Sequence, residues 1–203
     1  MKKIILFDID RTLIDTDYLA QETFKAIRHK IIGSTSQILE VRENYMKSLK
    51  STTDFKPENY CKELSRRFGS DYKTLTNTYY KSFDKGNNLL YHDTIPTLKR
   101  LKQKYLLGIF SEGYAKFQRH KLKYSGILPY FDEKYIFIKR RKTNTNSLKS
   151  FPKDCVIIDD RLDICEELAK NKLNVIWFNR LNQKMPETPK TIYKLTELVS
   201  FSI

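Results

Sequence analysis

The chain has 203 residues, of which 40% are apolar and 31% charged, a composition typical of a folded globular protein and not of a disordered one. No apolar stretch approaches the length that crosses a membrane, and the N-terminal apolar run is too short and too acidic for a signal peptide, so we expect a cytoplasmic protein. The formal net charge of +14 is compatible with an anionic partner, but charge alone does not identify nucleic acid, because binding requires basic side chains to cluster in space.

The first predicted element is a short strand that ends in two acids. Ile4–Phe7 is an uninterrupted apolar run, and Asp8 and Asp10 follow it. Because side chains of an extended chain alternate, these two carboxylates point the same way. Neighbouring carboxylates are costly to desolvate unless a cation or a reaction requires them. We therefore expect a site at the carboxyl end of this strand, where open parallel sheets bind their ligands.

Residues 16–86 predict helices with no strand between them. In the first predicted helix, the residues that recur at helical spacing are Leu19, Thr23, Ala26, Ile27 and Ile31. The next three are expected from Ser34 or Ser36 to about Leu49, from Pro57 to Phe68 and from Tyr72 to Phe83. We interpret these four helices as a separate module inserted after the first strand.

From His92 onward, predicted strands alternate with predicted helices. The strands are expected at Leu106–Phe110, Tyr135–Ile138, Cys155–Ile158 and Val175–Phe178, and the helices at Ile95–Lys104, Tyr114–Tyr124 and Leu162–Asn171. Such alternation implies a parallel sheet with right-handed crossovers. The expected fold class is therefore α/β, a doubly wound parallel sheet formed by residues 1–15 and 87–203, with a small four-helix domain at residues 16–86.

Polar side chains follow three of these strands, namely Asp8, Ser111 and the pair Asp159–Asp160. Hydrolysis of a phosphomonoester through an aspartyl-phosphate requires a carboxylate nucleophile and a second acid for proton transfer. It also requires oxygen ligands for Mg²⁺, and a hydroxyl and a cation to hold the phosphoryl group. The chain offers each of these parts near a strand end.

Four segments of the chain closely resemble the four motifs of the haloacid dehalogenase (HAD) superfamily of phosphatases. They are FDIDRTLID, LLGIFSEG, a lysine in IKRRKT, and VIIDDRLD. The segment that runs from YHDTIPTLKR to LPYFD also resembles the region around the second motif, so the likeness spans nearly the whole chain. It implies a Rossmann-like core and identifies the helices of residues 16–86 as an α-helical cap domain.

The resemblance implies a role for each candidate residue. Asp8 is implied as the nucleophile and Asp10 as the general acid–base. The implied Mg²⁺ ligands are Asp8, Asp10 through its backbone carbonyl, Asp159 and Asp160, with Asp163 as a supporting neighbour. The implied phosphate-binding side chains are Thr12, Ser111 and Lys142.

Two positions depart from the pattern of the family. Arg11 stands where glycine is most usual in the first motif. In the third motif both Lys139 and Lys142 are candidates, and we favour Lys142 because Thr143–Asn144 is able to begin a short helix directly after it.

The expected function is Mg²⁺-dependent hydrolysis of a small phosphorylated metabolite through phospho-Asp8. Family members that dehalogenate carbon lack the acid that corresponds to Asp10, so the resemblance favours a phosphatase. Two alternatives stay open: a phosphomutase of the same superfamily, and a non-catalytic protein of this fold that binds nucleic acid through its basic surface. The substrate and the oligomeric state do not follow from the sequence.

Overall fold

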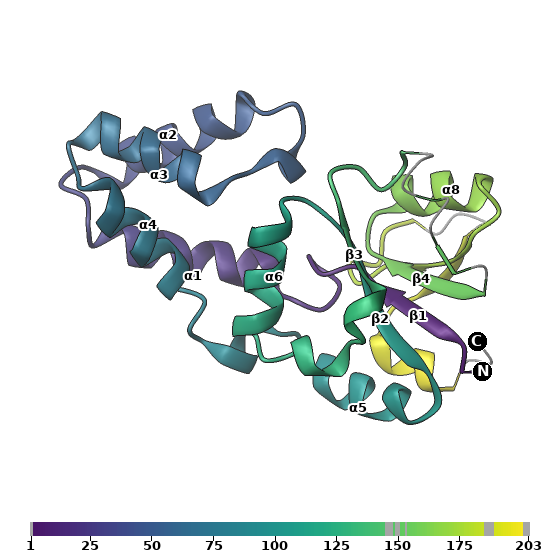
Figure 1. Cartoon of the computed structure of the whole chain (residues 1–203). Coiled ribbons are helices and arrows are strands. Elements are labelled where there is room, and N and C mark those ends of the chain that lie inside the picture. The colour runs from purple at the N-terminus through teal and green to yellow at the C-terminus, as the bar shows by residue number, and fades with distance from the viewer. Residues whose placement is uncertain (1, 145–147, 149–150, 153, 185–188, 201–203) are drawn as a thin grey trace.

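The protein is built around a single parallel sheet (Figure 1). The computed structural model describes residues 2–144, 148, 151–152, 154–184 and 189–200. Within these residues the strand order is β3-β2-β1-β4-β5-β6, and every pair is parallel. The strands are β1 (Ile4–Phe7), β2 (Leu106–Glu112), β3 (Ile136–Lys139), β4 (Cys155–Asp159), β5 (Asn174–Phe178) and β6 (Lys190–Ile192). The predicted α/β class with a parallel sheet is confirmed.

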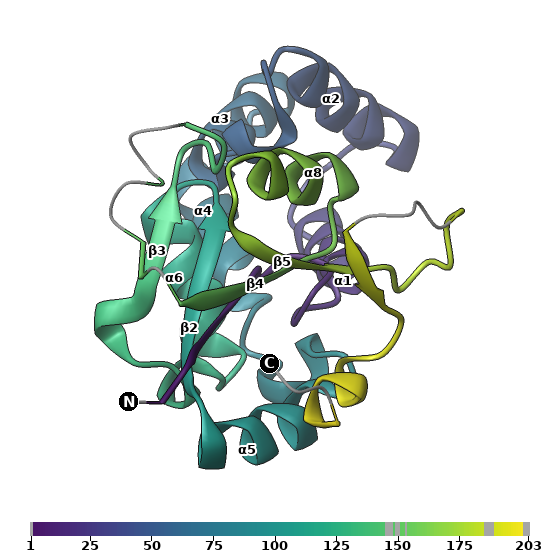
Figure 2. The ribbon, with the colours of Figure 1, turned by 90° about the vertical axis from the view of Figure 1, so that its right-hand side faces the viewer.

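Helices cover both faces of the sheet. Figure 2 shows α8 (Leu162–Lys170) on one side of the sheet and α5 (Thr94–Lys104) on the other. The next helix after α5 is α6 (Ala115–Tyr124), which contributes Leu122 to the same apolar cluster as α5. In the described parts of the chain, no helix is both long and apolar enough to span a membrane.

The central strand, β1, is buried on both faces. Ile5 and Phe7 belong to the apolar cluster on the α5 side, and Ile4 and Leu6 belong to the cluster on the α8 side. This division follows from the alternation of side chains along a strand. Each side chain of this size contributes roughly 1.5–3 kcal/mol when it is fully buried. The strand that carries the candidate nucleophile at its end is therefore held firmly in place.

The strand register brings the candidate acids together at one edge of the sheet. Phe7 of β1 is aligned with Ile109 of β2 and with Ile158 of β4. The residues that follow Phe7 and Ile158 are Asp8 and Asp159, which therefore lie side by side. The order of the strands reverses between β1 and β4, and open α/β sheets bind their ligands at such a switch point.

Four helices lie together beside the sheet (Figure 1), and their bounds are α1 (Thr16–Arg28), α2 (Thr35–Lys47), α3 (Pro57–Phe68) and α4 (Tyr72–Lys81). Local signals fix their ends. Ser34 and Gln37 form a capping box at the start of α2. Pro57 occupies the first turn of α3, and Gly69, at φ +68°, ends it. The four predicted helices are present, whereas the division into a core domain and a cap domain stays a prediction.

The bounds of β2, β3, β4 and β5 differ by one or two residues from the prediction, and β6 was not predicted. Strand β2 continues through Ser111 to Glu112, and β4 includes Asp159, because pairing with neighbouring strands extends past the apolar runs. Strand β6 was not predicted, since Lys190–Ile192 has the sequence KTI and lacks an apolar run. The extensions of β2 and β4 place two candidate side chains, Ser111 and Asp159, inside the sheet instead of in the loops beyond it.

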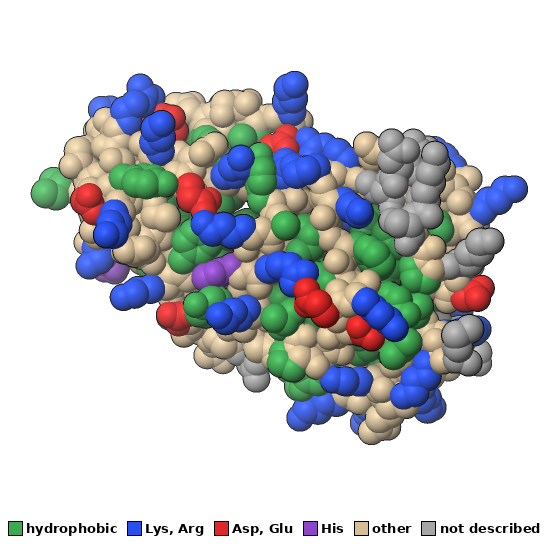
Figure 3. Space-filling model, in the orientation of Figure 1, with side chains coloured by type: hydrophobic (Ala, Val, Ile, Leu, Met, Phe, Trp, Pro, Cys, Tyr) green, Lys and Arg blue, Asp and Glu red, His purple; other side chains and the backbone are tan. Residues whose placement is uncertain are grey.

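The positive charge of the chain is dispersed on the face that Figure 3 shows. Lysine and arginine side chains lie over both the helical part and the sheet part and are interrupted by acidic and apolar side chains. On this face we find no continuous basic block of the kind that tracks a nucleic-acid backbone.

Candidate active site

A cavity of about 350 Å³ lies between α1–α4 and the carboxyl edge of the sheet. Of the predicted site residues, Asp8, Asp10, Lys142 and Asp160 line it. Asp159 does not, but its carboxylate contacts the Lys142 amine. The structure thus brings five of the seven predicted residues into one connected group.

Lys142 is the cation at the centre of this group. Its Nζ donates to Asp8 Oδ1 at 2.6 Å and to Asp159 Oδ2 at 2.5 Å, and the side chain is buried. Its backbone N–H donates to Glu112 Oε1 at 3.0 Å. The alternative, Lys139, is a half-buried residue of β3. The short helix expected after Lys142 falls mostly outside the described residues.

The acids of the site carry more negative charge than their neighbours neutralise. Burial raises the pKa of Asp8 to about 6; the Lys142 charge opposes this shift, and Asp159 and Asp10 add to it. Burial, together with the charges of Asp8 and Asp159, raises the pKa of Asp160 to about 8. Such mutual repulsion is relieved by a divalent cation.

The donor set fits Mg²⁺ in kind, because carboxylate oxygens are the ligands that this hard cation prefers. Within the described residues, Asp8 Oδ2 and the Asp160 carboxylate accept no hydrogen bond, so they are available as ligands. As the side chains stand, however, no group of three acids, histidines or cysteines in the described part is arranged to hold a metal ion. The metal ligands therefore stay a prediction.

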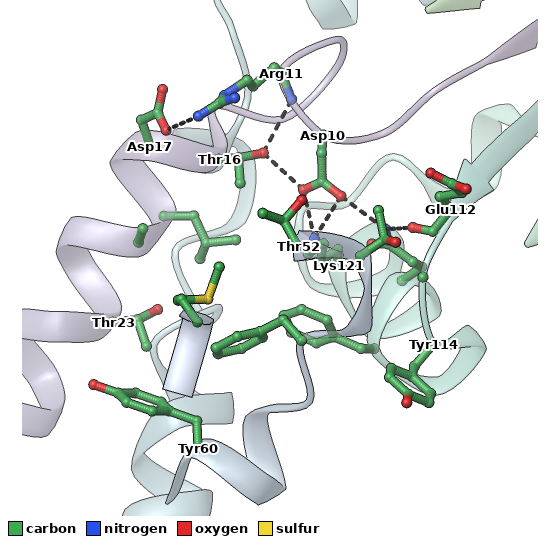
Figure 4. Close-up of a pocket in the computed structure, with 18 of the residues that line it drawn as sticks. Asp10, Arg11, Thr16, Asp17, Thr23, Thr52, Tyr60, Glu112, Tyr114 and Lys121 are labelled. Carbon is green, nitrogen blue, oxygen red and sulfur yellow. Dashed lines mark hydrogen bonds and ion pairs between the residues drawn. The ribbon is translucent and has the colours of Figure 1, made fainter. Parts of the chain in front are cut away.

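Asp10 is held by three donors (Figure 4). Lys121 Nζ donates to its two carboxylate oxygens at 2.6 and 2.8 Å, Gln118 Nε2 at 2.9 Å, and Thr16 Oγ1 at 2.8 Å. Burial on its own would raise the pKa of Asp10, but the Lys121 charge and these hydrogen bonds outweigh it and lower the pKa. Asp10 is thus kept in its carboxylate form.

Sequence reasoning missed all three of these donors and one further acid. Gln118 and Lys121 lie one turn apart on α6, and both are buried. Polar residues on the inward face of an amphipathic helix were the available signal. Glu112, which directly follows Ser111, accepts from the Lys142 backbone and from Arg161 Nη1 at 2.9 Å.

Thr12 and Ser111 are buried but do not line the cavity. Thr12 Oγ1 has no hydrogen-bond partner among the described residues, and Ser111 Oγ accepts only from Gln118 Nε2, at 3.3 Å. Their predicted phosphate-binding roles are not supported by a contact in the structure and stay predictions.

Arg11 adopts a backbone conformation that favours glycine. Its φ is +56°, in the left-handed region. The exposed side chain forms an ion pair with Asp17 at 3.0 Å. The departure from the family pattern at this position therefore places a strained residue at the edge of the cavity.

The loop that carries Lys142 is also attached to the helical part. Arg140 and Arg141 both form ion pairs with Asp54, which belongs to the short helix η1 (Thr52–Asp54). The two arginines also donate to Thr53, Arg140 to its carbonyl oxygen and Arg141 to its hydroxyl, each at 3.1 Å. We call this set of contacts, made by Thr53, Asp54, Arg140 and Arg141, the η1 contact.

Comparison with solved structures gives the same fold throughout. The HAD phosphatase from Thermococcus onnurineus is 25% identical, with a TM-score of 0.69, over 98% of this chain and 97% of that one. The HAD-hydrolase YfnB from Bacillus subtilis, bound to magnesium, is 20% identical, with a TM-score of 0.68, over 98% and 97%. The L-2-haloacid dehalogenase from Xanthobacter autotrophicus is 17% identical, with a TM-score of 0.61, over 98% of each chain.

These neighbours include both phosphatases and dehalogenases, so structural likeness alone does not separate the two activities. No curated protein matches the chain. The family of haloacid dehalogenase-like hydrolases matches residues 5–153. With most of its length covered by this match, and with the four sequence motifs on one sheet edge, the chain belongs to the haloacid dehalogenase-like hydrolase family.

Proposed function

We propose that the protein is a Mg²⁺-dependent phosphatase that hydrolyses a small phosphomonoester through an aspartyl-phosphate on Asp8. The observation that carries this proposal is the placement of Asp8 and Asp10 in one cavity, each with its own buried lysine. A nucleophile and a separate proton-transfer acid are what phosphoryl transfer to water requires. Dehalogenation of carbon has no use for the second acid, and the resemblance to the family agrees.

In the first step, Asp8 attacks phosphorus and the bond from phosphorus to the leaving oxygen breaks. Because Asp10 is a carboxylate in the free protein, the proton that the leaving oxygen needs enters on the phosphate monoanion and passes through Asp10 to that oxygen. Lys142, at 2.6 Å from Asp8, offsets the charge of the acids as the anionic phosphate approaches. In the second step, water attacks the phospho-aspartate. Asp10, kept as a carboxylate by Lys121, is in the form that accepts the proton of that water.

Mg²⁺, when bound, would neutralise the phosphate oxygens and the surrounding carboxylates. Asp8, the Asp10 backbone carbonyl, Asp159 and Asp160 are the residues that we propose hold it. The Lys142 amine already occupies one oxygen each of Asp8 and Asp159, which leaves Asp160 as the acid with no hydrogen bond from the described residues.

The test is phosphate release from a panel of phosphomonoesters, with Mg²⁺ or with a chelator, by the native protein and by Asp8→Asn. We expect release that depends on the metal and that Asp8→Asn abolishes, with unfolding temperatures that show both proteins to be folded. Transfer of phosphate to a second hydroxyl without net release would indicate a phosphomutase instead. Absence of any turnover by the folded native protein with Mg²⁺ would contradict the proposal.

A further inference from the structure

The part of the cavity that lies away from the acids has apolar walls. The helical part supplies most of them, through Leu19, Phe24 and Ile27 of α1, Met46 of α2, and Phe55, and α6 supplies Phe117. Figure 4 shows Asp10 and Thr16 at one end of the cavity and Thr23 and Tyr60 at the other. A phosphate at the acids would therefore point its leaving group along these apolar walls.

Three threonine hydroxyl groups of the cavity lining are engaged within the protein. Thr23 Oγ1 is hydrogen-bonded to Ser82 Oγ at 2.8 Å, and Thr16 Oγ1 donates to Asp10. Thr53 Oγ1 accepts from Arg141 at 3.1 Å. A sugar would find these three hydroxyls already engaged, and the side chains of Phe24, Phe55 and Phe117 offer its hydroxyl groups no hydrogen-bond partner. Polar groups that lose water without gaining partners oppose binding.

Aromatic side chains surround the same space. Phe55 lies 6.2 Å from Phe117, 5.8 Å from Tyr60 and 6.1 Å from Tyr79, measured between ring centroids, and all four rings line the cavity. Aromatic rings at such separations favour a further ring that packs against a face or an edge. The volume of about 350 Å³ is that of the whole cavity. Beyond a phosphate at the acid end, this leaves room for a group of ring size.

We propose that the leaving group of the substrate is an apolar body of about ring size, aromatic or branched aliphatic, and not a sugar. This inference rests on the proposed phosphatase function and names its substrate class. Binding energy from the apolar body would hold the ester in place for attack by Asp8.

Benzyl phosphate and glucose 6-phosphate make the sharpest comparison, because in both the leaving oxygen is bonded to a primary carbon. Intrinsic reactivity therefore does not decide between them. We expect kcat/KM to be at least tenfold higher for benzyl phosphate. Equal values, or a preference for the sugar phosphate, would overturn the inference.

Filling the cavity tests the same assignment. Ala20 of α1 lines it, whereas Gln21, next on the helix, is exposed and does not. We expect Ala20→Phe to lower kcat/KM for benzyl phosphate at least tenfold and that for the small ester methyl phosphate less than threefold. The control Gln21→Phe should leave both near native. Equal loss on the two esters in Ala20→Phe would overturn the inference.

A second pair of variants covers the case in which Ala20→Phe does not fold. Met46→Gln makes one wall polar at nearly constant volume, and Leu39→Gln makes the same change at an exposed position of α2. Only Met46→Gln should lower the preference for benzyl phosphate over glucose 6-phosphate.

A binding measurement tests this inference independently of catalysis. If no ester is hydrolysed, the proposed function fails, but calorimetry with the non-hydrolysable benzylphosphonate still decides the inference. Binding to the native protein that Met46→Gln weakens and Leu39→Gln leaves unchanged would support an apolar subsite. Absence of binding to the folded native protein would overturn it.

Discussion

At the scale of single residues, the site depends on a few buried charges that only partly neutralise one another. The Lys142 amine lies between Asp8 and Asp159, and burial alone would lower its pKa. The two carboxylates outweigh burial and raise that pKa above its ordinary value. A buried charge left without its partner is strongly destabilising, commonly by about 3–5 kcal/mol.

Replacement of this lysine tests both its role and the assignment of the third motif. We expect Lys142→Met to lower the free energy of unfolding by about 3 kcal/mol, and to reduce kcat at least a hundredfold. Lys139→Met, three residues earlier in β3, should change both little. Urea unfolding and phosphate-release assays measure the two effects. Loss of activity in Lys139→Met with retention in Lys142→Met would reverse the assignment.

Arg11 offers a stabilising substitution. A non-glycine residue at positive φ costs about 1 kcal/mol or more, and the exposed ion pair with Asp17 returns little of it. We expect Arg11→Gly to raise the free energy of unfolding by about 0.5–1 kcal/mol. The matched variant Arg11→Ala removes the same ion pair and keeps the strain. If the two variants unfold at the same urea concentration, backbone strain at this position is not the cause.

At the scale of elements, the loop after β3 connects the helical part to the acids. Arg140 and Arg141 bind Asp54 of η1, and the next residue, Lys142, binds Asp8. The position of Lys142 and the position of η1 are therefore linked through three consecutive residues. The link is polar and partly exposed.

Breaking the η1 contact should affect catalysis more than stability. Asp54→Asn removes the charge that holds both arginines, so we expect KM to rise several-fold, with little change in unfolding temperature. Glu43→Gln removes an exposed ion pair with Lys47 within α2 and serves as the control. Steady-state kinetics on both variants provide the measurement. Native KM in Asp54→Asn would show that the contact does not influence the site.

Five strands were predictable because each contains an uninterrupted apolar run, and β1 and β4 end in acids that mark the site. The sequence did not indicate β6, whose three residues pair with β5 only because the sheet is already formed. The contacts of Gln118 and Lys121 with Asp10 were not predictable either. They depend on the rotation of α6 against β1, across more than a hundred positions of the chain, and no local pattern encodes that.

At the scale of the whole molecule, the surplus of buried carboxylates makes stability depend on pH. The pKa values of Asp8 and Asp160, about 6 and about 8, lie above the ordinary value of 3.8. At these two groups the folded protein therefore binds more protons than the unfolded chain between about pH 4 and 8, and the lowered pKa of His120 opposes them only on the acid side of its ordinary value of 6.5. This contribution to stability is fully present below pH 4 and is lost as pH rises through 6 and 8.

We therefore expect the free energy of unfolding, measured in the presence of a chelator, to decrease between about pH 5 and 8. The lowered pKa of Asp10 and the raised pKa of Lys142 act outside this window, on the acid and alkaline sides respectively. Asp160→Asn should flatten the upper half of the curve, and saturating Mg²⁺ should flatten it for the native protein. A native stability that rises between pH 5 and 8 with the chelator would contradict the assignment of these shifts.

The central position of β1 has a consequence for synthesis on the ribosome. Strand β1 emerges before its two partner strands, which begin at Leu106 and Cys155. Its four apolar residues therefore stay unpaired while most of the chain is synthesised. The four helices of residues 16–81 make mostly local contacts and are able to form during that interval. The nascent chain thus gains the helices that wall the cavity before the sheet that positions its acids, and Asp8 and Asp159 come together only when β4 docks beside β1.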